Sequence, residues 1–214
     1  MDREHLPRKA AWLGALLSLL LLGASATHAA QPCKLAVLGD SLTAGYGVAA
    51  TDAFPVRLEE ALRERGLDCT VVNAGVSGDT SAGGAARIEW VLADQPTHLL
   101  VELGGNDALR GLPVDQMRAN IEKIVATAKA RGVKVILAGM LAPPNLGRTY
   151  GDAFKEVLTS IAEAQDVPLY PFFLDGVILQ RELMQPDGIH PNARGVAVIV
   201  ERMAPFIVEA IQEG

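Results

Sequence analysis

Five short apolar runs alternate along this chain with longer stretches in which apolar residues recur at helical spacing. The runs are continuously apolar, which is typical of parallel strands that are covered on both faces. Parallel neighbours need long connections, usually helices that cross over with a right-handed sense. The pattern therefore predicts an α/β protein, a three-layer α/β/α sandwich around a parallel sheet. Its strands are expected at 35–38, 69–72, 98–103, 133–137 and, briefly, 167–170.

Three of the intervening stretches show the apolar face of an amphipathic helix, the first of them between Thr51 and Gly66. Only 5% of the 214 residues are aromatic although half are apolar, so the core is expected to be mainly aliphatic. No repeat or break in composition divides 31–214, which we expect to be a single domain. The three apolar faces comprise Phe54, Leu58 and Leu62; Met117, Ile121, Ile124 and Ala128; and Val196, Val200, Met203 and Ile207.

Residues 1–30 have the organisation of a secretory signal peptide. Basic residues at positions 3, 8 and 9 precede an apolar run at 10–22, and small residues follow that run. Cleavage is expected near 26–30. The run is short for a membrane span, and an uncleaved anchor is the alternative. We therefore expect a periplasmic or secreted protein that keeps no stable membrane anchor after cleavage.

The chain has two cysteines, Cys33 and Cys69, and each lies six residues before a glycine that follows an apolar run. If those two strands are neighbours, the thiols lie at matching heights. A disulfide between them is then physically reasonable in an oxidising compartment. The sequence does not fix the distance between the two Cα atoms, so bridged and free thiols both remain open.

Glycine-rich polar turns follow three of the expected strands, at 39–41, 73–79 and 104–107. In open parallel sheets, ligands bind beyond the carboxyl ends of the strands. Three such turns at one edge of the sheet therefore predict a site there. A late loop that contains Asp187 and His190 would have to join them.

Ser41, Asp187 and His190 are the residue types of a catalytic serine with its base. A serine hydroxyl is a poor nucleophile near neutral pH unless a base takes its proton and a third group orients that base. Pro191 keeps His190 out of helical geometry and is expected as the first residue of the last helix. Asp187 could then accept a hydrogen bond from one ring nitrogen and leave the other for Ser41. The alternatives are a simple capped turn around the serine and a solvated histidine on a surface turn.

Acyl transfer also needs hydrogen-bond donors for the oxyanion, and three are candidates. They are the backbone N–H of Ser41, the backbone N–H of Gly78 and the side-chain amide of Asn106. Gly78 offers its N–H without a side chain in the way. An ordinary turn at Gly78 and a helix cap at Asn106 are the alternatives.

Four sequence blocks resemble, in the same order, those of the SGNH (GDSL) hydrolase family: Gly39-Asp40-Ser41-Leu42, Ser77-Gly78-Asp79, Gly104-x-Asn106-Asp107 and Asp187-x-x-His190. They span nearly all of 31–214, and their flanks are similar to the branch of bacterial periplasmic acyl-thioesterases, lysophospholipases and arylesterases. The resemblance implies a flavodoxin-like sheet of five parallel strands. It also implies a triad of Ser41, Asp187 and His190, and an oxyanion hole of Ser41, Gly78 and Asn106. The cysteine pair is not part of the family's pattern.

From the residues and the resemblance we expect a serine esterase that works through an acyl-serine intermediate. Its expected substrates are carboxylic esters and thioesters, including acyl-CoA thioesters, lysophospholipids and aryl esters. A short-chain O-acetyl esterase acting on glycans and a non-catalytic periplasmic protein that binds acyl ligands are the alternatives. The acyl tail is expected over apolar loop residues, for which ordinary loop packing is the alternative: Leu109, Leu141, Pro143, Pro144, Leu146 and Ile189.

We expect no metal, no cofactor and no nucleic-acid partner. Two histidines and two separated cysteines remain in 31–214, too few for a convincing metal site, and His98 is expected to be structural. No glycine motif for phosphates or dinucleotides opens a helix. The net charge of −6 comes without a basic stripe that could neutralise phosphates. The expected partner is a small acyl ester or thioester, and the oligomeric state is left open with a monomer expected.

Overall fold

The strands form one parallel sheet in the order β2-β1-β3-β4-β5. The computed structural model describes Met1 and residues 32–213, so the expected signal peptide lies outside the described residues apart from Met1. Each expected run forms a strand, and the predicted α/β fold class is confirmed. The strands are β1 (Cys33–Gly39), β2 (Cys69–Gly75), β3 (His98–Glu102), β4 (Lys134–Ala138) and β5 (Leu169–Tyr170).

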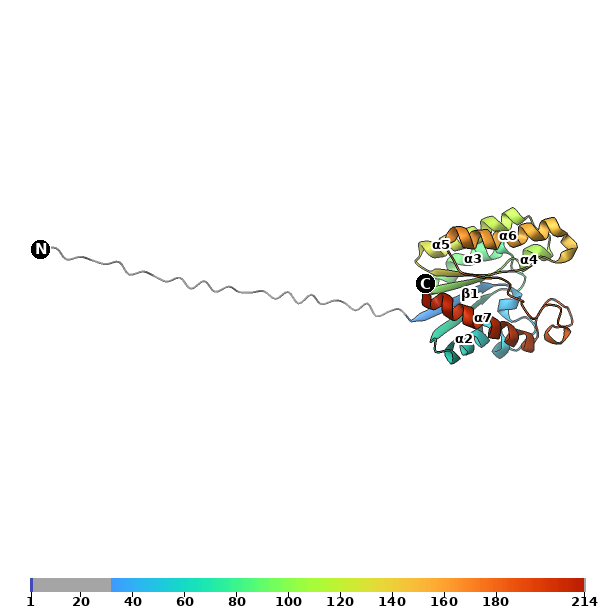
Figure 1. Cartoon of the computed structure of the whole chain (residues 1–214), viewed down its shortest axis with the longest axis horizontal. Helices are drawn as coiled ribbons and strands as arrows, with labels where there is room; N and C mark the ends of the chain where they lie inside the picture. Colours follow the sequence, from blue (N-terminus) through green and yellow to red (C-terminus); the bar gives the residue numbers. More distant parts are fainter. Residues whose placement is uncertain (2–31, 214) are drawn as a thin grey trace. The chain divides into compact units, whose positions relative to one another are not determined.

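Helices cover both faces of this sheet (Figure 1). α2 and α7 pack together on one face, and α3, α5 and α6 form the layer on the other. The helices within residues 32–213 are α1 (Ser41–Ala44), α2 (Phe54–Glu64), α3 (Ser81–Ala93), α4 (Gly105–Leu109), α5 (Val114–Ala130), α6 (Arg148–Gln165) and α7 (Ala193–Glu213). Three short 3₁₀ turns are η1 (Ala50–Asp52), η2 (Pro144–Leu146) and η3 (Arg181–Leu183).

The core is aliphatic, as expected from the composition. All five residues of β3 are buried, and α5 and α7 turn their predicted apolar faces inward. Every helix and strand of the described residues belongs to one compact unit, which is separate from residues 1–30. Within the described residues, no helix combines the length and the apolar character that a bilayer crossing requires.

The last helix begins two residues later than predicted. Pro191 is not its first residue, because Pro191 instead forms an antiparallel bridge with Met184. The side chain of Asn192 accepts hydrogen bonds from the backbone N–H groups of Arg194 and Gly195, at 3.0 and 3.1 Å. An asparagine in this role satisfies donors that the first turn leaves free, so Asn192 caps α7 and the prediction for Pro191 is wrong.

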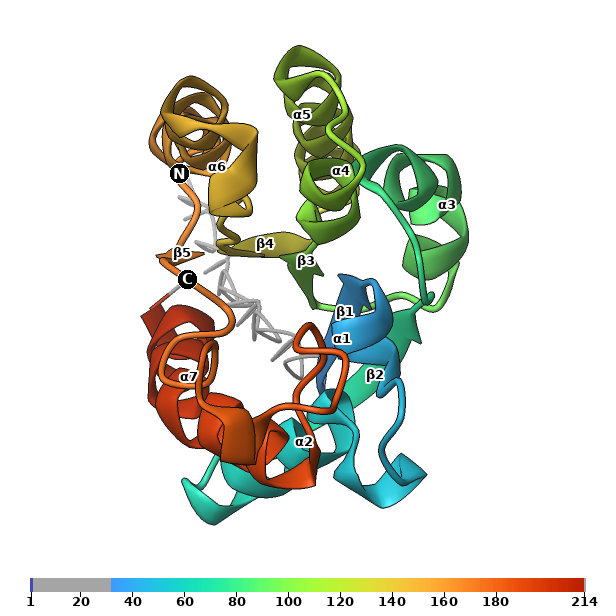
Figure 2. The ribbon, with the colours of Figure 1, turned by 90° about the vertical axis from the view of Figure 1, so that its right-hand side faces the viewer.

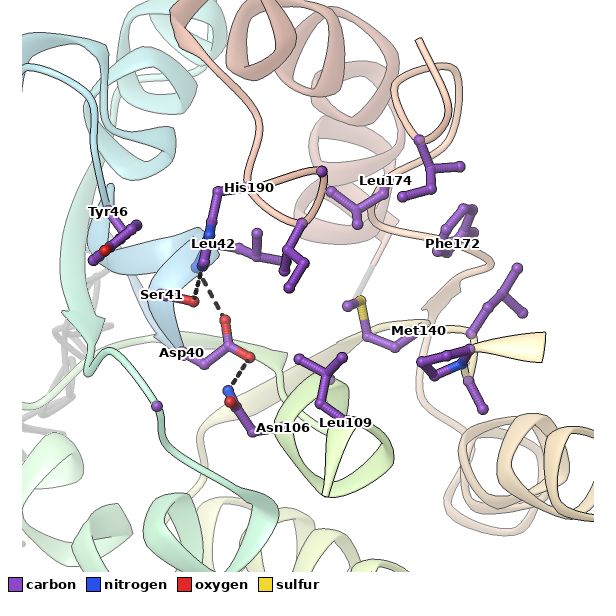
Figure 3. A pocket seen from close by; sticks show the side chains of 18 of the residues that line it. Asp40, Ser41, Leu42, Tyr46, Asn106, Leu109, Met140, Phe172, Leu174 and His190 are labelled. Atoms are coloured by element: carbon purple, nitrogen blue, oxygen red, sulfur yellow. Dashed lines mark hydrogen bonds between the residues drawn. The ribbon is translucent and has the colours of Figure 1, made fainter. Parts of the chain in front are cut away.

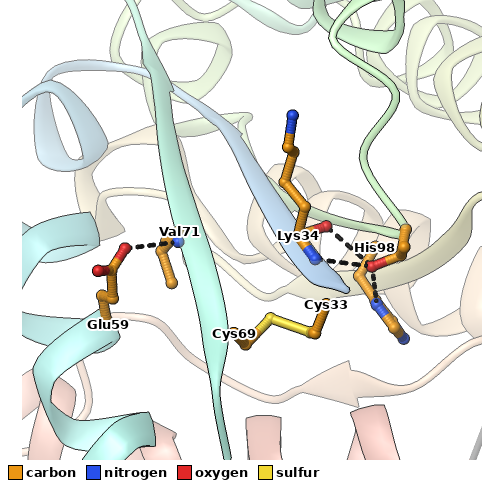
Figure 4. The surroundings of a disulfide bond; sticks show 7 residues. Cys33, Lys34, Glu59, Cys69, Val71 and His98 are labelled. Carbon is orange, nitrogen blue, oxygen red and sulfur yellow. Dashed lines mark hydrogen bonds between the residues drawn. A yellow bond between two sulfur atoms is a disulfide. The ribbon is translucent and has the colours of Figure 1, made fainter. Parts of the chain in front are cut away.

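The amino ends of β1 and β2 are joined by a disulfide (Figure 4). Cys33 and Cys69 are register partners in the two strands, and their sulfurs are bonded. His98, the first residue of β3, lies at the same end of the sheet and is buried, with Nδ1 2.9 Å from Thr97 Oγ1. Burial lowers the pKa of His98 to about 4, so this histidine is neutral at physiological pH.

Candidate active site

Ser41 is the first residue of α1, directly beyond the carboxyl end of β1. Asp40 caps this one-turn helix, because its Oδ1 accepts a hydrogen bond of 3.0 Å from the N–H of Leu42. The turn is closed by Gly45, which has a φ of +83° and donates its N–H to the carbonyl of Ser41. The serine is thus held on a short, capped turn at the edge where parallel sheets bind ligands.

His190 reaches Ser41 from the loop between η3 and α7, 149 residues further along the chain. Figure 2 shows this orange-red loop beside α1. Ser41 Oγ lies 2.8 Å from His190 Nε2, and His190 Nδ1 lies 2.7 Å from Asp187 Oδ2. An ionised carboxylate can only accept, so Nδ1 carries a proton and Nε2 is free to accept the proton of the hydroxyl.

The Asp187 carboxylate is fixed within its own loop. Its Oδ1 accepts hydrogen bonds from the backbone N–H groups of Ile189 and His190, at 2.9 and 3.0 Å. Gly188 has a φ of +69°, which allows the loop to fold back on the carboxylate. The backbone hydrogen bond from His190, together with its side chain, lowers the pKa of Asp187 to about 2. Asp187 is therefore ionised at every pH at which the fold would be assayed.

Gln185 ties the histidine loop to the rest of the site. Its Nε2 donates to the carbonyl of Tyr46 at 2.7 Å and to that of Pro191 at 2.9 Å, and its N–H donates to the carbonyl of His190 at 2.8 Å. The rings of Tyr46 and His190 lie 4.6 Å apart. These contacts hold the histidine loop against the segment that follows α1. The sequence analysis did not identify Gln185 or Tyr46, because no local pattern links them to His190.

The structure places Gly78 and Asn106 around the same opening as Ser41. Gly78 follows β2 in a turn and has a φ of +86°, a conformation that favours glycine. Asn106 lies in the first turn of α4, and Gly104 rather than Asn106 occupies the cap position. One amide hydrogen of Asn106 is donated to Asp40 Oδ2 at 2.9 Å (Figure 3), which leaves the second for another acceptor.

Asp107, next to Asn106, has a structural contact of its own. Its carboxylate accepts from the backbone N–H and the hydroxyl of Ser81 at 2.7 and 2.6 Å, in a buried position. This pair fastens the first turn of α4 to the start of α3. The contact fixes the position from which the Asn106 side chain extends.

An apolar cavity of about 740 Å³ opens beside Ser41 (Figure 3). Its volume falls in the range of small-molecule sites. Five of the six expected substrate-binding residues line it: Leu109, Leu141, Pro143, Pro144 and Ile189. Leu146 is not among the lining residues and lies near Gly111 instead. Further apolar lining residues, which the sequence analysis did not identify, are Met140, Phe172, Leu174, Ile178 and Leu179.

The added lining residues come mainly from the segment after β5. Because β5 has only two residues, the sequence pattern does not predict that the following loop, 171–180, forms one wall of the site. The position of that loop beyond a carboxyl strand end is the signal that could have indicated it. In the part of the chain that the structure describes, no cluster of three or more His, Cys, Asp or Glu residues could hold a metal ion.

Comparison with known proteins gives consistent matches over most of the chain. The model of the GDSL-like Lipase/Acylhydrolase family matches residues 37–198. A Vibrio mimicus protein named "Arylesterase" is 40% identical over 195 residues, which cover 91% of this chain and 98% of that protein. The "Thioesterase 1/protease 1/lysophospholipase L1" of Escherichia coli K12 is 41% identical over 203 residues, covering 94% and 91%. A crystal structure of TesA has a TM-score of 0.77 at 41% identity and covers 80% of this chain and 96% of its own.

Proposed function

This chain belongs to the GDSL-like lipase/acylhydrolase family, and we propose that Ser41 is its nucleophile, His190 its base and Asp187 the carboxylate that orients the base. The protein is a serine esterase of the ester- and thioester-hydrolysing kind. One observation carries the assignment of residues: His190 contacts Ser41 through Nε2 at 2.8 Å and Asp187 through Nδ1 at 2.7 Å. A protein that only bound acyl ligands would not need this proton path.

In the first step the Ser41 oxygen attacks the carbonyl carbon while His190 Nε2 takes the hydroxyl proton. Asp187 stays ionised and stabilises the imidazolium. The tetrahedral oxyanion is stabilised by the N–H groups of Ser41 and Gly78 and by the free amide hydrogen of Asn106. Collapse breaks the ester or thioester bond, and His190 returns its proton to the leaving alcohol or thiol. An acyl-serine remains.

The second step repeats the chemistry with water. His190 Nε2 takes a proton from a water molecule, whose oxygen attacks the acyl-serine carbonyl. The same three donors stabilise the second oxyanion. The bond between the acyl carbon and Ser41 Oγ then breaks, the serine oxygen regains its proton from His190, and a carboxylic acid is released.

The cavity beside Ser41 supports our proposal for the substrate class. Its lining is mostly aliphatic and aromatic, and its volume of about 740 Å³ leaves room for much more than an acetyl group. We place the acyl chain of the substrate in this cavity and its leaving group toward Tyr46 and Ser77 at the other side of the opening. Lysophospholipids, acyl thioesters and aryl esters of longer acids fit this arrangement better than acetylated glycans do.

The proposal is tested by covalent labelling of Ser41. After treatment with a serine-directed phosphonate, mass spectrometry should locate one adduct on the peptide that contains Ser41, and S41A should neither be labelled nor hydrolyse p-nitrophenyl esters. T80A, which removes the hydroxyl that caps α3, serves as a matched hydroxyl-loss control and should still be labelled. Full esterase activity in S41A would refute the proposal.

We also propose that the protein is exported and that residues 1–30 are removed. The disulfide between Cys33 and Cys69 supports this, because such bonds persist in oxidising compartments. Intact mass of the protein purified from a periplasmic extract should correspond to a chain that begins between residues 27 and 31. A full-length mass in the membrane fraction would contradict the proposal.

A further inference from the structure

A second carboxyl group, Glu102, lies directly beneath the turn that carries Ser41. Glu102 is the last residue of β3 and is completely buried. Its Oε2 accepts hydrogen bonds from the Thr43 hydroxyl at 2.8 Å and from the Asp40 backbone N–H at 3.3 Å. The two donors flank Ser41, one residue before it and two residues after it. One oxygen atom therefore holds both sides of the nucleophile turn.

The strand opposite Glu102 is shaped to allow this contact. Gly39 is the register partner of Glu102 in the pairing of β1 with β3. A Cβ atom at residue 39 would overlap the Thr43 side chain and would lie 2.6 Å from Glu102 Oε2. The absence of a side chain at Gly39 thus makes room for the hydrogen bond between Thr43 and Glu102.

The same array extends to the oxyanion donor Asn106. Asp40, whose backbone is held by Glu102, uses Oδ1 to cap α1 and Oδ2 to hold the Asn106 amide at 2.9 Å. A shift of the Asp40 backbone would therefore move Ser41 and Asn106 together. Both groups act on the same carbonyl of the substrate in the proposed mechanism.

The surroundings of Glu102 raise the pKa of its carboxyl group. Glu102 takes part in none of the ion pairs found within residues 32–213. The Asp40 carboxyl acts on Glu102 electrostatically, and Arg87 from α3 is engaged by Asp79 and by the Gly39 carbonyl. Burial and the nearby Asp40 carboxyl raise the pKa of Glu102 well above its usual range.

We propose that Glu102 is a positioning residue that sets Ser41 and Asn106 in register for the reaction. It contacts the turn through its acceptor oxygen and touches no substrate, because it is not among the residues that line the cavity. The inference rests on the proposed role of Ser41. Small displacements of reacting groups reduce rates on the order of 10²-fold even when binding is intact.

The test compares E102Q, E102A and T43V with the wild-type enzyme. Glutamine keeps a side-chain oxygen that can accept both hydrogen bonds, so E102Q should retain kcat within about threefold. E102A should lose kcat on the order of 10²-fold, with KM changed by less than about threefold because the acyl cavity is intact. T43V, which removes one hydrogen bond and preserves shape, should lose kcat about tenfold. If E102A does not fold, E102Q and T43V decide the outcome.

Two controls separate positioning from mere stability. H98A removes a buried polar side chain from the other end of β3 and should lower the melting temperature while kcat is unchanged. Titration with the phosphonate gives the concentration of competent sites for each variant, so kcat is expressed per labelled Ser41. The kcat of E102Q should follow the wild-type profile from pH 6 to 8.

The inference is overturned if E102A and T43V keep the wild-type kcat per site, or if E102Q is as slow as E102A. The first result would make Glu102 purely structural, and the second would show that its charge is required. Failure of the proposed function gives a different result, because the wild-type enzyme itself would then carry no phosphonate on Ser41.

Discussion

Loss of the Cys33–Cys69 disulfide is expected to destabilise the fold by about 4 kcal/mol and to leave catalysis unchanged. The bond joins the amino ends of β1 and β2, whereas Ser41 lies beyond the carboxyl end of β1. Seven register pairs hold these strands side by side with or without the bond. The folded state should therefore keep its geometry, and the effect should fall on the unfolded chain.

The magnitude follows from the size of the closed loop. The two cysteines are 36 residues apart in sequence. In the chain-entropy treatment, a cross-link over a loop of that size removes about 13 cal/mol/K of entropy from the unfolded chain, or about 4 kcal/mol at 25 °C. For a domain of this length, that loss corresponds to a melting temperature lower by about 10 °C.

Urea unfolding of the oxidised wild type and of the C33A/C69A variant measures the difference directly. Wild type treated with a reductant is a second reference, because it keeps both sulfur atoms and lacks only the bond. The kcat for a p-nitrophenyl ester at 25 °C should agree among all three within about twofold. A difference in the free energy of unfolding below about 1 kcal/mol would refute the reasoning, and so would a tenfold loss of kcat.

Three further predictions concern the site, the buried histidine and the cavity. D187N should lower kcat on the order of 10⁴-fold with an unchanged fold by circular dichroism, because the amide favours the wrong tautomer of His190, and a loss below tenfold would contradict the triad. His98 has a pKa of about 4 in the folded state, below its usual value of 6.5, so the unfolded state binds more protons between these pH values. The free energy of unfolding should therefore fall by about 3 kcal/mol as the pH drops from 6.5 to 4. Urea titrations of H98Q should show a smaller dependence on pH, and an unchanged dependence would exclude His98 as its source. For p-nitrophenyl esters, kcat/KM should rise about fourfold for each methylene added to the acyl chain until the cavity is filled. F172A, which enlarges the cavity, should extend this rise to longer acyl chains. A preference for acetate would indicate a short-chain esterase instead.

Much of the fold could be predicted because its central strands are covered on both faces. Continuous runs such as the one in β3 have no polar face, so their number and parallel arrangement could be read directly. α3 and α6 are not among the helices that the sequence pattern predicts. α3 opens with Ser81-Ala82-Gly83-Gly84, which weakens any helical pattern, and is held at its start by Asp107 from a distant segment.

The polar residues of the site could be predicted where a residue type suited to catalysis occurs within a recognisable local sequence pattern. His190 is one of only four histidines, and Ser41, Asp187 and His190 each lie in or next to a turn with its own sequence pattern. Glu102 and Gln185 could not be found this way. A glutamate at the end of an apolar run resembles an ordinary solvated strand end, and its burial depends on Gly39 of the neighbouring strand.

Leu146 shows the opposite error. Leu146 lies in a loop beside the expected site and is predicted to contact the acyl chain of the substrate. In the structure it lies near Gly111 instead. The loop 141–147 contains a 3₁₀ turn, Pro144–Leu146, which rotates Leu146 away from the neighbouring prolines that do line the cavity. Side-chain direction within an irregular loop depends on backbone angles that composition does not specify.

The 149-residue separation between Ser41 and His190, the proposed nucleophile and base, makes enzymatic turnover a readout of complete folding. A chain that has formed its first strands, or that has been cut short before the final loop docks, holds a serine with no partner to activate it. A newly made polypeptide should therefore hydrolyse no ester until this loop has docked. During refolding, hydrolysis should reappear only when the loop that carries His190 has reached Ser41.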